Sequence, residues 1–297
     1  MLLYLREDQI VKVQNMTITR NMYIDYLIEN FNLINQNGDS QDYFLSGDEQ
    51  ALKKYNATCK NDSLKIVTQL VPQPLCGNLL KGDIFLCSLN PGYQEEDLYL
   101  EGVKKSQFNY PDYKQSIINL LCQNGAIDNS MFFISEEPAE GIYKENSPGS
   151  KYWRKKLNQA NKEKSLVHNL VKELQDRGHN TNESAVFQML ADRIVTLELF
   201  PYHSDKFDRS LLNASQYSFK SVNMMKSFVH DDLIPKAEER DVLVVFLRSF
   251  KAWDVKESME SNHVILNKAN VQRPTFGIDY NVGRAMFEFI LRKTDNA

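Results

Sequence analysis

The sequence predicts an α/β protein of three layers, with helices on both faces of a mostly parallel central sheet. From residue 82 onward, strand-like apolar runs alternate with helical patterns, which is typical of βαβ units. The run 241–247 is almost wholly apolar, without polar alternation, as expected for a strand buried on both sides. The run 84–89 is too short for a helix and stops at Asn90-Pro91-Gly92, a strong turn signal.

The other elements follow from periodicity and capping signals. Apolar residues at helical spacing predict a helix over 22–33, and Asp48 can cap a short helix through Tyr55. A β-branched, alternating run predicts a strand over 64–70. The helix over 218–233 is expected to stop at Pro235. Further helices are expected over 111–122, 165–177, 184–190 and 280–293, and further strands over 131–134, 194–200 and 264–266.

Length and composition indicate one large domain with an N-terminal elaboration. A chain of 297 residues can bury a sizeable core, and no linker rich in Gly, Ser or Pro divides it. We therefore expect residues 1–75 to pack as an elaboration on an α/β domain of residues 76–297. The formal net charge of −4 excludes a protein coated with basic residues, so polyanion binding would have to rest on a local patch.

Cysteine usage and hydropathy point to a cytoplasmic protein. The four cysteines have neither CxxC nor Cys/His ligand spacing, which favours free thiols in a reducing compartment. No apolar window approaches the length of a membrane span. We expect a monomer without a membrane partner, a metal or another cofactor.

Three loops are expected at the carboxyl edge of the sheet, where they could converge on one ligand. The first runs from Asn90 to Tyr93, the second is 201–204 (Pro-Tyr-His-Ser), and the third is 267–277. Asn90 can orient a water through its amide, and Tyr93 offers a ring face for stacking. Glu198, near the end of a strand, can accept a hydrogen bond from an exocyclic amino group.

Taken together, these loops resemble those of the uracil-DNA glycosylase superfamily. Residues 90–92 match the Asn-Pro-Gly form of its mismatch-specific and single-strand-selective branches, in which the Asn positions the attacking water. The resemblance covers roughly residues 82–292 in order and topology, but only short motifs in identity. It implies a uracil-DNA glycosylase-like fold, base flipping, and a monofunctional DNA glycosylase that acts on DNA in base-excision repair without a cofactor.

The chain also departs from the pattern of that family. The third loop reads Arg273-Pro274-Thr275 where the family commonly has His-Pro-Ser. Asn270, Gln272 or Arg273 could substitute for the missing histidine, or His203 could serve from the second loop. We therefore take Asn90 and His203 as the catalytic candidates.

The base expected in the pocket follows from a second departure. Glu198 stands where the uracil-reading amide of the family is expected. A carboxylate there favours a cytosine-type base, modified cytosines included, over uracil. Such a pocket would also suit the excision of modified bases from foreign DNA, for example in defence against phage. Glu198 and Tyr93 are the base-binding candidates.

A basic segment, 144–164, carries a local net charge of +5 together with Tyr152 and Trp153. Cations for phosphates and rings for unstacked bases would suit a DNA strand, whereas a charge run is otherwise a solvated helix face. Arg273 could contact phosphate, and Phe276 could intercalate as a wedge. The DNA-binding candidates are Lys151, Arg154, Lys155, Lys156, Arg273 and Phe276.

Other interpretations of the same residues stay open. Asn-Pro-Gly is often a plain turn, Tyr93 could serve packing, and Glu198 could face solvent or pair with Arg193. At the level of function, a nucleic-acid-binding module without catalysis would use the same fold and the same basic segment. A nucleotide- or sugar-phosphate-processing enzyme would use the turn for an anion, but the chain lacks a P-loop and a GxGxxG fingerprint.

Overall fold

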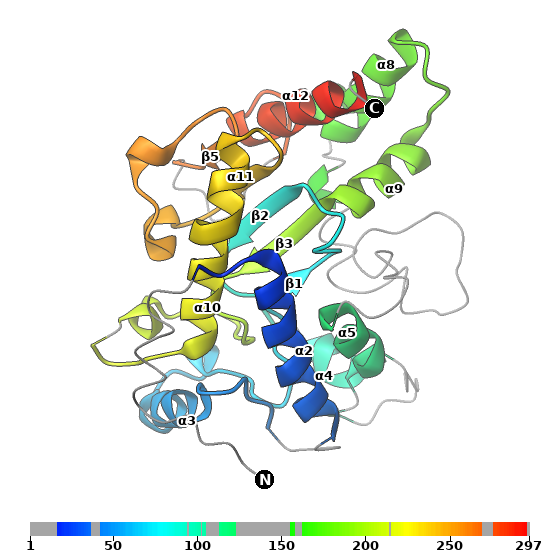
Figure 1. Cartoon of the computed structure of the whole chain (residues 1–297). Helices are drawn as coiled ribbons and strands as arrows, with labels where there is room; N and C mark the ends of the chain where they lie inside the picture. Colours follow the sequence, from blue (N-terminus) through cyan, green and yellow to red (C-terminus); the bar gives the residue numbers. More distant parts are fainter. Residues whose placement is uncertain are drawn as a thin grey trace.

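A computed structural model describes residues 17–36, 42–93, 95–101, 103–104, 113–122, 155–157, 162–213, 215–268 and 276–295. It contains a five-stranded sheet in the order β1-β3-β2-β4-β5 (Figure 1). β1 is antiparallel to β3, and the other neighbours pair in parallel. The mostly parallel sheet expected from the sequence is thus confirmed. The strands are β1 (Leu75–Cys76), β2 (Ile84–Ser88), β3 (Ile194–Glu198), β4 (Leu243–Phe246) and β5 (Val264–Leu266).

Helices cover both faces of the sheet. α8, α9 and α12 pack with one face and lie together at the top right of Figure 1, while α2, α3, α5, α10 and α11 contribute to the core on the other face. The helices are α2 (Arg20–Gln36), α3 (Glu49–Thr58), α4 (Glu95–Leu100), α5 (Tyr113–Leu121), α8 (Leu166–Asp176), α9 (Glu183–Arg193), α10 (Lys220–Phe228), α11 (Ile234–Glu238) and α12 (Asn281–Asp295). Short 3₁₀ turns are η1 (Asp62–Leu64), η3 (Lys162–Lys164), η4 (Arg209–Leu212), η6 (Phe250–Trp253) and η7 (Glu257–Met259).

The two cores explain why the strands read as unbroken apolar runs. In β2, Phe85 and Cys87 face the core beneath α2 and α10, whereas Ile84 and Leu86 face the core beneath α8 and α12. Successive strand residues point to opposite faces, so a strand covered on both sides must be apolar at every position. All four residues of β4 are buried in this way. Within the described residues, no helix has the length and apolar character that a membrane span requires.

The described part of the N-terminal elaboration shares the core with the sheet instead of forming one of its own. Its expected boundary after residue 75 falls inside β1. The fully buried Asp48 ties it to the rest of the chain: its carboxylate accepts hydrogen bonds from the Tyr202 hydroxyl at 2.9 Å and from the Ser221 amide at 3.2 Å. Asp48 precedes α3 but does not cap it through its side chain.

The prediction of a strand over 64–70 is wrong. The chain there makes the turn η1 and then a single bridge between Val67 and His203. The side chain of Asn56 accepts from the Ile66 amide and donates to the Ile66 carbonyl, both at 2.9 Å. Because a side chain satisfies this backbone, the alternating sequence has no ladder to join. The strand expected over 131–134 lies outside the described residues.

The helix expected to stop at Pro235 continues past it. Between α10 and α11 the chain forms a π-helical turn, η5 (Val229–Leu233), and α11 then carries Pro235 in its first turn. A proline is tolerated in a first turn because its missing N–H leaves no intrahelical bond unmade there. In the π turn, Asp231 accepts from the Ile18 amide at 3.0 Å and Asp232 from the Arg20 amide at 3.1 Å. These two carboxylates fix the start of α2.

Gly283 of α12 provides a test of the close packing of this helix against residues 276–277. A Cβ at this position would lie 2.2 Å from the Gly277 carbonyl oxygen and 2.5 Å from that of Phe276. Gly283→Ala should therefore lower the free energy of unfolding by about 1–3 kcal/mol, although alanine favours helix. Urea denaturation measures the change.

Gly178 is the matched control for that substitution. It has a positive φ of 87°, but nothing lies within 4 Å of a Cβ built on it. Gly178→Ala should cost only the backbone strain, about 1 kcal/mol. A smaller loss at Gly283 than at Gly178 would contradict the close approach of α12 to residues 276–277.

Candidate functional site

The pairing of β2 with β3 brings two of the three expected loops together. In the parallel register Ser88 is paired with Glu198, the last residue of each strand. The pairing continues beyond the strands, because the Phe200 amide donates to the Leu89 carbonyl at 2.8 Å. The loop that starts at Asn90 therefore lies beside the loop 201–204.

A side-chain hydrogen bond joins these two loops directly. The Asn90 amide nitrogen donates to the hydroxyl of Ser204 at 3.2 Å. Ser204 is fully buried, while Asn90 is half-buried. Among the described residues this is the single partner of the Asn90 side chain. One amide hydrogen and the amide oxygen of Asn90 therefore stay available to a small molecule at the edge of the sheet.

The His203 ring lies between the Asn-Pro-Gly loop and the main chain at Val71. Its Nδ1 lies 2.8 Å from the Gly92 carbonyl oxygen and its Nε2 lies 3.2 Å from the Val71 carbonyl oxygen. His203 as a whole is 4% exposed. Burial lowers the pKa of His203, and the charge of Asp97 and the two carbonyls oppose that shift.

This arrangement corrects the role expected for His203. Both ring nitrogens face main-chain carbonyls, so the ring presents no nitrogen to a substrate. His203 is placed to position the loop rather than to act on a reacting atom. The loop in turn depends on Gly92, whose φ of 77° lies in the left-handed region that favours glycine.

Glu101 was not singled out from the sequence, yet it belongs to the same network. Its Oε2 accepts a hydrogen bond from the Val71 amide at 2.7 Å, and the side chain is buried. Burial raises the pKa of Glu101 to about 8, against the opposing effects of the Val71 amide and of Lys114. Glu101, Val71, His203 and Gly92 thus form a continuous chain of contacts behind the loop.

Glu198 ends β3 with one carboxyl oxygen unpartnered. Its Oε2 is buried and has no hydrogen-bond partner. Burial raises the pKa of Glu198 to about 8, although a hydrogen bond with Ser88 and the charge of Arg248 act in the opposite direction. The alternative that Glu198 pairs with Arg193 is wrong. Arg193 instead forms a bidentate ion pair with Asp83 at 3.0 and 2.8 Å.

Tyr93, the expected stacking ring, is half-buried after Gly92. Burial raises the pKa of the Tyr93 hydroxyl, and nearby charges on Lys104 and on Glu95 and Asp97 modify it in opposite directions. The ring thus stands at the same edge as Asn90, in surroundings that are more acidic than basic.

The expected DNA contacts are only partly described. Lys151, Arg154 and Arg273 lie outside the described residues. Lys155 is exposed and Lys156 half-buried, next to Leu157, which is buried in the core and whose carbonyl accepts from the Ser165 hydroxyl at 3.2 Å. Leu157 thus joins the described part of the basic segment to Ser165, at the start of α8.

Phe276 requires a correction. We expected it to intercalate, but it is fully buried, among residues such as Val282 and Met286 of α12. A side chain in the core cannot insert between base pairs unless that core opens. The third loop therefore offers no wedge at this position.

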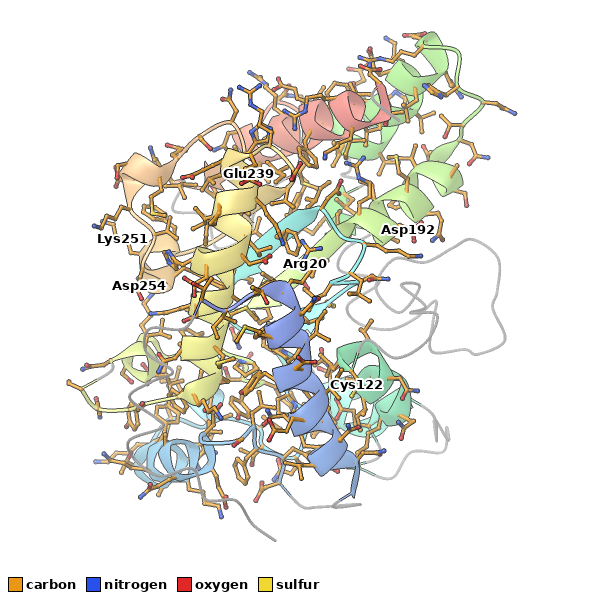
Figure 2. All side chains as sticks on the ribbon, viewed as in Figure 1. Arg20, Cys122, Asp192, Glu239, Lys251 and Asp254 are labelled. Atoms are coloured by element: carbon orange, nitrogen blue, oxygen red, sulfur yellow. The ribbon has the colours of Figure 1, made fainter. Side chains whose placement is uncertain are left out.

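An open cavity of about 570 Å³ lies at the opposite, amino edge of the sheet. Its charged groups largely neutralise one another: Lys236 donates to both carboxylate oxygens of Asp232 at 2.8 Å, and Arg20 Nε lies 3.9 Å from Asp232 Oδ2. Figure 2 shows Arg20 at the start of α2, beside the sheet. We interpret this cavity as a polar junction between α2, α11 and the sheet.

The cysteines offer no reactive group at the site. All four, Cys59, Cys76, Cys87 and Cys122, are free thiols. Burial raises the pKa of Cys76 and of Cys87 well above its usual value, and a protonated thiol is a poor nucleophile. Across the described ranges, no three residues of the His, Cys, Asp or Glu types gather as metal ligands do.

The buried carboxyl of Glu101 makes stability depend on pH. An unfolded glutamate has a pKa of about 4.3, and the folded pKa of Glu101 is about 8. Its contribution to stability is therefore fully present below the unfolded pKa and is lost as the pH rises through about 8. Glu101→Gln keeps an acceptor for the Val71 amide but removes the titration.

We expect the advantage of Glu101→Gln over the wild type, in free energy of unfolding, to grow between pH 5 and pH 8. The slope should be at most about 1.4 kcal/mol per pH unit. Denaturant titrations at several pH values measure it, with exposed Glu238→Gln as the control. A difference that is constant with pH would mean that Glu101 titrates normally.

The comparisons with known proteins leave the resemblance to the uracil-DNA glycosylase superfamily as an expectation. No family model matches this chain, and neither a curated protein nor a solved structure matches it. The residues gathered at the carboxyl edge of the sheet are the features that bear on function.

Proposed function

We propose that this protein is a monofunctional DNA glycosylase that hydrolyses the N-glycosidic bond of a flipped pyrimidine and leaves an abasic site. The observation that carries the proposal is the position of two polar side chains. The Asn90 amide and the Glu198 carboxyl, one oxygen of which is buried without a partner, stand at the carboxyl ends of two paired parallel strands. Ligands of open α/β sheets bind at this edge.

The chemistry needs a positioned water more than a strong base. The bond between the base nitrogen and C1′ breaks with its electron pair going to the base, and the sugar becomes oxocarbenium-like. Water then bonds to C1′ through its oxygen and releases its proton to the departed base or to solvent. Asn90 would hold this water through the amide oxygen and the hydrogen that Ser204 does not use.

The remaining residues would hold the loops and the base. His203 and Ser204 tie the Asn-Pro-Gly loop to the neighbouring loop, which supports a preorganised water site. Tyr93 would stack on the base and Glu198 would bond to its edge, which favours a cytosine-type base, modified cytosines included. Lys155 and Lys156, within the basic segment, would contact phosphates.

The biological setting is proposed from the same residues. The resemblance implies base-excision repair, and a pocket with Glu198 in place of an amide would suit modified bases in foreign DNA, phage DNA included. In both settings the protein would act on DNA alone, without a metal or redox cofactor, in the cytoplasm and as a monomer.

Asn90→Ala tests the assignment of the water site. We expect abasic-site formation to fall about 100-fold or more, because the water loses the groups that orient it, while DNA affinity stays within a few-fold. The assay uses duplexes and single strands that carry different pyrimidines, treated with alkali to cleave abasic sites. The control is Asn223→Ala, an exposed asparagine on α10.

Three results would contradict the proposal in different ways. Full activity of Asn90→Ala would remove Asn90 from the reaction. Salt-dependent DNA binding that the pair Lys155→Ala and Lys156→Ala weakens, without abasic sites from any pyrimidine, would identify a nucleic-acid-binding module without catalysis. Turnover of mononucleotides without affinity for DNA would identify a nucleotide-processing enzyme.

A further inference from the structure

The unpartnered oxygen of Glu198 is unusual enough to need a cause. More than nine in ten buried polar groups in proteins have a hydrogen-bond partner. The described residues contain a few side-chain atoms without one, and Glu198 Oε2 is the one that belongs to a residue ending a strand at the carboxyl edge of the sheet. A buried oxygen without a partner at this position indicates that a ligand supplies the missing hydrogen bond.

The surroundings of Glu198 disfavour a carboxylate. Arg193 is paired with Asp83, and Arg248, which follows β4, acts on Glu198 through its charge alone. Ser88 of β2 supplies one hydrogen bond, and the neighbouring thiols of Cys76 and Cys87 carry no charge. Burial of an ion with so little compensation is costly, and accordingly the pKa of Glu198 rises to about 8.

A neutral carboxyl differs from a carboxylate in what it can recognise. A carboxylate only accepts hydrogen bonds, whereas the acid presents one donor and one acceptor side by side. The complementary ligand edge must carry an acceptor next to a donor. The N3 nitrogen and the N4 amino group of cytosine form such an edge.

We propose that Glu198 reads the flipped base as an uncharged carboxylic acid, donating to N3 and accepting from the N4 amino group of a cytosine-type base. The inference rests on the proposed function and names its substrate class. The donated hydrogen bond would also stabilise the negative charge that N3 shares as the base leaves. Glu198 is thus a specificity-determining residue that acts in the transition state as well.

Two substitutions separate the acid from the carboxylate. Glu198→Gln keeps a donor and an acceptor without a charge, and Glu198→Ala removes both. In excision of cytosine-type bases at pH 7, we expect kcat/KM of Glu198→Gln to stay within about 10-fold of the wild type. Glu198→Ala should lose about 100-fold or more, as expected for two hydrogen bonds. Exposed Glu238→Gln is the control, and thermal unfolding shows that each variant is folded.

The pH profile supplies a second readout that a purely structural role would not move. Wild-type kcat/KM should decline as the pH rises through about 8, because Glu198 then loses the proton that it donates. The profile of Glu198→Gln should lack this decline. If Glu198→Gln is folded and as inactive as Glu198→Ala, Glu198 works as a carboxylate and the proposal is overturned.

Binding of a free base separates this inference from the proposed activity. The wild type should bind 1-methylcytosine at pH 7 at least about 10-fold more tightly than 1-methyl-2-pyrimidinone, which lacks the amino group. Calorimetric titration measures both, and Glu198→Ala should abolish the difference. If this preference is found but no DNA loses its base, the hydrolase proposal fails and Glu198 keeps its role. If the wild type binds both bases equally, or neither, the reading of the base by Glu198 is wrong.

Discussion

The parallel pairing of β2 with β3 is the constraint on which the candidate site depends. Its register places Ser88 opposite Glu198 and carries on as far as Leu89 and Phe200. The positions of the two polar side chains follow from that register. Asn90 lies beside the second loop, and the Glu198 carboxyl lies at the end of β3. A slip of one residue would turn Glu198 to the other face of the sheet and separate it from Ser88.

Consecutive residues of the second loop each make a different tie. Tyr202 donates to Asp48 of the N-terminal elaboration, His203 lies between the Gly92 and Val71 carbonyls, and Ser204 accepts from Asn90. The elaboration is therefore part of the support of the site and not an appendage to it. Because these polar groups are buried, each tie is expensive to lose, which favours a rigid edge over a mobile one.

The fold could be predicted from the sequence to the extent that it follows local patterns. Unbroken apolar runs that end at Asn-Pro-Gly or at Phe200-Pro201 identify buried parallel strands, and 264–266 is found as predicted. The convergence of the first two loops also follows, since parallel strands end at one edge. The site details do not: Asp48 and Glu101 act through partners far away in sequence. The local signal at Asp48 predicts a helix cap that its side chain does not make, and no local signal marks Glu101.

The failed expectations have the same origin. The alternation over 64–70 is that of a strand, but the Asn56 side chain takes the hydrogen bonds that a ladder would use. Phe276 lies in the third loop, a candidate for DNA contact, yet its ring is buried in the core between the sheet and α12. Whether an aromatic residue beside a loop is buried depends on the volume left by other elements, which a sequence pattern does not contain.

The π-helical turn η5 makes the length of one helix unusually constrained. A π turn holds about one residue more than an α turn, and one residue rotates a helix face by about 100°. This offset lets α10 stack Phe228 on Tyr23 of α2 while α11, in the same continuous helix, contacts β4 and β5. Loss of a single residue between 229 and 233 would rotate the contact face of α11 relative to that of α10. The chain can therefore tolerate insertions in its surface loops far better than a one-residue deletion here.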